Sequence, residues 1–348
     1  MRRNPWIDRP SGAPAEGRRR GGLLLGLLAA CAPAVPGAGL AAQEGGPVEP
    51  VGQLECCLLL LVPVGARSSA MGGTVTARDG SDAVFRNPAG LADLTGSTFV
   101  IHHSDLAIDQ QIDAFSLLIT PLSSTFGLSY QLFDKGEVAT TDGTGEQTGE
   151  LSFRDHLLVA SFSTGLGAGL AMGVNYKLFQ QRINCRGACG GEESVGTTHA
   201  TDLGLRYQPR WDPALELGIA VANLGFPLQV VNAAQADPFP GRIHVGAAYN
   251  VLRPVRSDSL LGLRVAVEVR DRLREPGSPV ASVGLEFDVQ QAIFLRAGYA
   301  PGEGLGSGAA VGVELRYDRF DIAVSRSFVN SSLEADSEPF QVSFGLNF

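Results

Sequence analysis

The sequence is poor in charge, in large aromatic side chains and in long apolar runs. Charged residues make up 18% of its 348 residues, below the ~25% usual for soluble domains, and it has two Trp and six Tyr. Its two clear apolar runs, residues 21–30 and 56–64, are shorter than the ~20 residues that a membrane-spanning helix needs. No helical membrane span is therefore expected, while a hydrophobic share of 44% excludes a disordered chain.

Common catalytic motifs are also missing. The sequence has no G-x-S-x-G, no Walker A loop and no H-E-x-x-H. The glycine-rich stretches 165–169 and 302–306 do not complete G-x-G-x-x-G and are interpreted as turns between strands. His102 and His103, followed by Asp105, suggest a metal site, but adjacent residues of a strand point to opposite faces. We therefore expect no catalytic residue, no metal and no cofactor.

Glycine, with 44 residues, is nearly twice its ~7% background and shows no collagen-like period. From Ser97 onward, apolar residues often recur at every second position, the period of a β-strand with two different faces. In the segment 340–348, for example, the even positions are apolar and the odd positions are polar or glycine. Fourteen strands are predicted in all, at 97–104, 112–120, 122–133, 150–164, 168–181, 198–208, 214–225, 241–252, 259–270, 279–288, 291–300, 307–317, 319–327 and 339–348.

The connections between these strands alternate roughly between short and long, which is the pattern of outer-membrane barrels. Polar and charged residues share one strand face, as with Glu268 and Arg264, and such a face suits a polar lumen. The soluble alternative, a β-sandwich or barrel, would point its apolar face inward. The short links lie at 121, 289–290 and 318, and the long ones at 134–149, 182–197 and 226–240.

The sequence therefore predicts an all-β fold, a 14-stranded antiparallel transmembrane β-barrel in the bacterial outer membrane, over residues 96–348. Its last strand ends on an aromatic residue, which resembles the assembly signal of outer-membrane proteins, here Phe344, Leu346 and Phe348. Outer-membrane lipid, lipopolysaccharide and the barrel assembly machinery are the partners that such a barrel implies. The segments 112–120 and 150–164 alternate poorly, so the pattern leaves their register open.

The start of the chain has the pattern of an export signal. Three arginines at 18–20 precede the short apolar run, and small residues follow up to Ala42, which predicts a secretory signal over residues 1–42. The alternative is lipoprotein processing, with Cys31 as the acylated N-terminus. Without its six arginines and two acidic residues, the chain keeps 21 basic and 34 acidic residues and shows no clustered basic surface for nucleic acid.

Residues 63–92 read PVGARSSAMGGTVTARDGSDAVFRNPAGLA, and segments such as ATDLGLRYQP (200–209) and FLRAGYA (294–300) follow. In this order they resemble the PorV/PorQ family, which is related to the FadL-type fatty-acid transport barrels. The resemblance implies a fourteen-stranded barrel with residues 43–95 as a small N-terminal plug in its lumen. The motif is interpreted either as a gating plug or as a structural turn. Its residues are Gly72, Gly73, Asn87, Pro88, Ala89, Gly90 and Leu91.

The cysteines give one further expectation. Cys185 and Cys189 are close enough in sequence for a local disulfide, which suits an oxidising compartment. A zinc site is the less favoured alternative, because only His199 and the acidic pair 192–193 are near. The adjacent Cys56 and Cys57 have no interpretation from sequence.

For function, the resemblance implies two roles. The first is a non-enzymatic barrel that binds or carries exported proteins, as in type IX secretion, through the plug and the long loops. The alternative is a FadL-like transporter of hydrophobic small molecules, which requires an apolar pocket near the plug, where Val84 and Phe85 are candidates. An outer-membrane enzyme ranks behind both.

Overall fold

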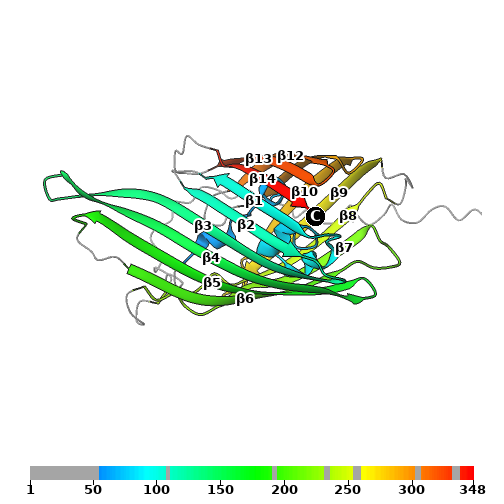
Figure 1. Cartoon of the computed structure of the whole chain (residues 1–348), viewed down its shortest axis with the longest axis horizontal. Helices are drawn as coiled ribbons and strands as arrows, with labels where there is room; N and C mark the ends of the chain where they lie inside the picture. Colours follow the sequence, from blue (N-terminus) through cyan, green and yellow to red (C-terminus); the bar gives the residue numbers. More distant parts are fainter. Residues whose placement is uncertain are drawn as a thin grey trace, which may run out of the picture. The chain divides into compact units, whose positions relative to one another are not determined.

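The computed structural model describes residues 55–106, 110–189, 194–230, 236–253, 260–301, 307–330 and 338–348. The predicted export signal, Cys31 and the first residues of the predicted plug lie outside these ranges. The described residues form a closed barrel in which each strand pairs antiparallel with its neighbours in the chain and β1 pairs with β14 (Figure 1). The predicted fold class is confirmed.

The barrel is preceded by four short helical turns, η1 (Leu58–Leu61), α1 (Ala66–Ala70), η2 (Ser81–Phe85) and η3 (Pro88–Asp93). None of the described helices has the length and apolar character to cross a membrane, a result with no bearing on crossing by strands in a β-barrel. The fourteen strands are β1 (Thr98–Asp105), β2 (Gln111–Ile119), β3 (Ser124–Thr141), β4 (Gln147–Gly167), β5 (Leu170–Gly187), β6 (Ser194–Tyr207), β7 (Leu215–Gly225), β8 (Arg242–Asn250), β9 (Leu261–Arg272), β10 (Val280–Val289), β11 (Ile293–Ala300), β12 (Ser307–Tyr317), β13 (Phe320–Asn330) and β14 (Phe340–Asn347).

The two faces of the wall differ as a membrane barrel requires. On β9, Val267 is 50% exposed on the outside while its neighbour Glu268 is 3% exposed on the inside. The predicted assembly signal follows the same alternation, with Phe344 and Phe348 exposed on the outer surface. A soluble barrel would bury its apolar face and expose its charges. The barrel is therefore an outer-membrane protein, as predicted.

Several strands are longer than the apolar pattern predicts. The predicted loop 134–149 is mostly strand, because β3 continues to Thr141 and β4 begins at Gln147. The predicted loop 182–197 is likewise shortened by the ends of β5 and β6. These extensions pass beyond the apolar band, where both faces meet water, so pairing continues without apolar alternation. At the turn between β3 and β4, the Thr144 hydroxyl donates to Asp142 and lowers its pKa.

The predicted short turns all lie at one end of the barrel, together with Ser97 and Phe348, which exchange backbone hydrogen bonds. The three predicted long connections, including that between β7 and β8, lie at the other end. In outer-membrane barrels short turns face the periplasm and long loops face outward. We call these the turn end and the loop end.

Residues 55–97 run through the lumen from the loop end to the turn end. At the loop end, the Glu55 carboxylate pairs with Arg242 at 2.6 Å, and the Cys56 N–H donates to the Pro238 carbonyl. Between the two ends the segment follows the inner wall. It contacts the strands in falling order, from β14 at Ala66 to β3 at Leu91. Residues 55–97 are called the plug below.

The plug lies against a band of inward glycines, which we call the glycine girdle. A Cβ atom on any of them would collide with or crowd plug atoms, so only glycine lets the two backbones approach this closely. At Gly218, for example, the added carbon would overlap the Thr76 carbonyl. The girdle consists of Gly173, Gly204, Gly218, Gly246, Gly284, Gly298 and Gly312, on β5, β6, β7, β8, β10, β11 and β12.

The girdle predicts which glycines are required. In Gly218→Val the side chain has no space beside Thr76, and such overpacking costs about 1–3 kcal/mol. We expect a lower thermal unfolding midpoint and increased protease cleavage of the plug in the purified barrel. The matched control is Gly165→Val, on β4, where an added carbon meets nothing within 4 Å. Equal midpoints for the two variants would contradict a tight seat for the plug.

Candidate functional site in the barrel lumen

The Asn-Pro-Ala-Gly-Leu motif of the plug is fixed both to itself and to the wall. The Asn87 amide donates to the Thr76 and Leu205 carbonyls, at 2.6 and 3.2 Å, and its oxygen accepts from the Ala89 N–H. Pro88 begins η3, where a residue without an N–H leaves no helical hydrogen bond unmade. The Leu91 carbonyl accepts from the Thr125 hydroxyl of β3 at 2.8 Å. These contacts hold the turn against the wall.

The predicted plug positions require glycine for two different reasons. Gly72 and Gly73 have φ values of 62° and 77°, in the left-handed region that side chains disfavour. At Gly90 there is no space for a Cβ because the Arg78 carbonyl lies against it. Both observations give the glycines a structural reason, and neither bears on whether the plug moves.

One side of the lumen is charged. Arg78 of the plug reaches Glu216 of β7 at 2.9 Å and Glu286 of β10 at 3.2 Å. Glu286 also accepts from Arg264 at 2.6 Å and from Arg296 at 2.7 Å, the residues opposite it on β9 and β11. Alternating sign on neighbouring strands thus joins the plug to the wall in one ion-pair network.

A cavity of about 910 Å³ lies beside this network at the turn end. Its lining includes Arg78, Glu216 and Glu286, and also turn residues such as Gln291 and Asp318. A space with this lining suits water and polar solutes, and we call it the charged vestibule.

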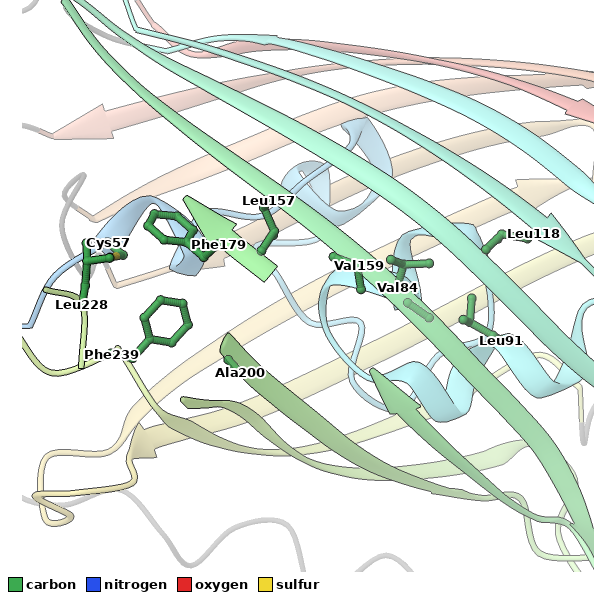
Figure 2. Close-up of a cluster of buried hydrophobic side chains, with 11 residues drawn as sticks. Cys57, Val84, Leu91, Leu118, Leu157, Val159, Phe179, Ala200, Leu228 and Phe239 are labelled. Atoms are coloured by element: carbon green, nitrogen blue, oxygen red, sulfur yellow. The ribbon is translucent and has the colours of Figure 1, made fainter. Parts of the chain in front are cut away.

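The opposite side of the lumen carries most of its buried apolar side chains, alongside ion pairs such as that between Lys177 and Asp202. Figure 2 shows its side chains in a row, from Cys57 and Phe239 at one end to Leu91 and Leu118 at the other. A smaller cluster around Phe133 is packed against η1 at the loop end. We call these residues together the apolar sector. Its wall members are Ile112, Leu118, Phe133, Leu157, Val159, Phe179 and Ala200, on β2 to β6, and its other members are Cys57, Ala83, Val84, Leu91, Leu106, Leu228 and Phe239.

The apolar sector explains why two predicted strands alternate poorly. In β4, Leu158 faces the lipid while Leu157 and Val159 face the lumen, so three consecutive residues are apolar. In β2 the same holds for the run 117–119, where Leu118 points inward. A strand with lipid on one face and apolar lumen on the other has no polar face to alternate with.

Other predicted residues are placed as follows. Val84 is fully buried in the apolar sector, and Phe85 packs against it. A disulfide joins Cys185 to Cys189 at the loop end of β5. A second disulfide joins Cys56 to Cys57 at the loop end of the plug. Figure 2 shows Cys57 close to Leu228.

The two adjacent histidines lie on opposite faces of β1, as the strand argument requires. His102 points inward, where its ring nitrogen Nδ1 lies 2.7 Å from the Ser343 hydroxyl. His103 points outward and pairs with Asp113 at 2.7 Å. Within the described residues, no group of three or more potential ligands is arranged to hold a metal.

The residues that sequence reasoning missed are Arg78 and the apolar wall positions Leu157, Val159 and Phe179. The run Leu157-Leu158-Val159 is the signal that could have identified the apolar sector, because it breaks the alternation of a polar lumen face. Arg78 gives no such signal, since its partners are more than 100 residues away in sequence.

The ion-pair network predicts a large effect at Arg78. Arg78→Met removes the closest cation of the buried Glu216, while Glu286 keeps Arg264 and Arg296. Breaking a buried pair in this way costs at most about 3–5 kcal/mol. The control Arg154→Met breaks an exposed pair with Asp134 and costs at most about 1 kcal/mol. Urea unfolding of both purified barrels measures the difference. Similar midpoints would mean that the network does not hold the plug.

Three solved structures share the fold at low sequence identity. The Pseudomonas putida toluene transporter TodX has a TM-score of 0.59 and 16% identity, over 85% of this chain and 99% of that chain. The CymD monoaromatic hydrocarbon channel has a TM-score of 0.57 and 14% identity, over 83% and 98%. A Pseudomonas aeruginosa FadL homologue has a TM-score of 0.51 and 11% identity, over 82% and 99%. The likeness at this identity is one of fold.

Among curated proteins, no sequence matches significantly. The PorV/PorQ resemblance, drawn from the plug and strand motifs, therefore stays a prediction, while the relation to FadL-like barrels is supported at the level of fold. A family match covers residues 37–348, which include the plug and all fourteen strands. The chain belongs to the family described as "Uncharacterised protein family (UPF0164)".

Proposed function

We propose that this barrel conducts small hydrophobic molecules across the outer membrane. The observation that carries the proposal is the apolar sector, in which inward side chains of β2 to β6 pack against the plug from the loop end to Leu91. A water-filled pore has a polar interior, and apolar side chains on its inner wall serve no purpose there. Apolar pockets with few polar groups are typical of sites for small hydrophobic ligands.

The solved structures of similar fold support the same direction. Two of them are described as a toluene transporter and a monoaromatic hydrocarbon channel. A molecule such as toluene matches the sector because burial of its surface beside Phe179, Leu157 and Val159 is favourable at roughly 25 cal/mol per Å².

The structure gives less support to the carrier of exported proteins. That role was expected to use the long loops, but much of 134–149 and 182–197 is paired strand. The sector, by contrast, is enclosed by the wall and the plug, where a folded protein has no access.

The plug separates the apolar sector from the charged vestibule. Val84 and Leu91 are the plug's side chains on the turn-end side of the sector. The Val84 carbonyl accepts a hydrogen bond from Asn175, and the Leu91 carbonyl accepts one from Thr125. A solute that continues through the lumen requires these residues to shift. In this proposal the plug motif limits the rate of passage.

The test is uptake of labelled toluene by cells that lack their own outer-membrane channel for hydrophobic solutes. Cells producing this barrel are expected to take up toluene faster than cells carrying an empty vector. In Leu157→Asn a polar amide replaces an apolar side chain of the sector, and burial of such a group costs about 1–3 kcal/mol. Channel-dependent uptake is then expected to fall about tenfold.

Leu157→Met is the matched control, because it keeps the side-chain volume and the apolar character. It is expected to retain uptake. Unheated gel mobility shows whether each variant has folded in the membrane. Wild-type uptake at the empty-vector rate, or equal uptake by the folded Asn and Met variants, would overturn the proposal.

A further inference from the structure

Several polar side chains on the inner face of β2 to β6, Ser161 and Asn175 among them, carry atoms without a hydrogen-bond partner, and three others lie together. They are the hydroxyls of Ser116 and Ser129 and the amide nitrogen of Gln131, in residues that are at most 1% exposed. Ser116 on β2 lies directly opposite Ser129 on β3, and Gln131 is the next inward residue along β3. We call these three residues the polar patch.

The polar patch is surrounded by the apolar sector. On β4, Val159 lies opposite Ser129 and Leu157 lies opposite Gln131. Buried polar groups in proteins are almost always hydrogen-bonded, and an unmade bond is costly. Unpartnered donors beside the apolar side chains Leu157 and Val159 have the composition of a ligand site in which a few polar groups fix the orientation.

Charge on this side of the lumen restricts the class of ligand. On the described inward-facing positions of β3 and β5, Lys135 pairs with Asp155 at 2.6 Å and Lys177 pairs with Asp202 at 2.8 Å. Arg206, inward on β6, pairs with Asp93. A carboxylate entering the sector would lose its hydration, while the cations near it are already neutralised.

We propose that the sector takes a neutral solute with an apolar body and one hydroxyl group, an aromatic or aliphatic alcohol. The hydroxyl oxygen accepts from the Gln131 amide, and its proton is donated to Ser116 or Ser129. A hydroxyl is matched to the patch because it both donates and accepts. This inference rests on the proposed function, and it names the solute class of the same site.

The test uses three probes with one carbon skeleton: toluene, benzyl alcohol and benzoate. Benzyl alcohol is expected to compete with channel-dependent toluene uptake at a lower concentration than benzoate. In the variant Ser129→Ala/Gln131→Leu, half-inhibition is expected to need about fivefold more benzyl alcohol, the effect of one lost neutral hydrogen bond.

Ser325→Ala is the matched control. Ser325 is also a buried lumen serine whose hydroxyl lacks a partner, but it lies on β13, beside α1 and away from the apolar sector. It is expected to leave competition by benzyl alcohol unchanged. Competition by benzoate equal to that by benzyl alcohol, or an unchanged half-inhibition in the double variant, would overturn the inference.

Saturation-transfer NMR of benzyl alcohol on the purified barrel gives a second readout that does not need transport. The double variant is expected to bind benzyl alcohol about fivefold more weakly than the wild type. Ser325→Ala is expected to bind it as tightly as the wild type. If wild-type cells take up no toluene, the proposed function fails, and this measurement still decides the solute class. If wild-type cells take up toluene but the barrel does not bind benzyl alcohol in preference to benzoate, only the inference about the solute class is contradicted.

Discussion

The close contact between the plug and the inner wall is the constraint on which the rest of the lumen depends. A peptide segment can lie against a barrel wall only where the wall has no side chains in the way. The glycine girdle provides that space on seven strands, and Asn87 uses it to bond the wall and the plug together. The high glycine content is therefore partly a property of this interface.

Once the plug is seated, it divides the lumen into two different environments. On one side, Arg78 places a positive charge between Glu216 and Glu286, so the wall and the plug share one ion-pair network. On the other side, Val84 and Leu91 complete an apolar surface begun by the wall. Neither half is complete without the plug, since on one side Glu216 would lose its closest cation and on the other side apolar side chains would be exposed to water.

The number and order of the strands follow from the sequence for a simple reason. Where lipid lies outside and polar lumen inside, residue polarity alternates with a period of two, and most of the fourteen strands were recognised in this way. The same reasoning fails at β2 and β4, because Leu118 and Leu157 face an apolar lumen. It also fails at the loop ends of β3 to β6, where water on both faces removes the need for alternation. The deviations from the pattern thus mark where the lumen and the membrane boundary change.

The sequence by itself determined the fold class, the strand order and the two ends of the barrel, because each depends on local spacing, while the plug followed only from the family resemblance. Only the tertiary structure decided which inward residues meet across the lumen. Arg78 and Glu286 are separated by more than 200 residues, and Leu91 and Leu157 belong to the plug and to β4. Their contacts depend on closure of the barrel around the plug, a long-range event that no local pattern encodes.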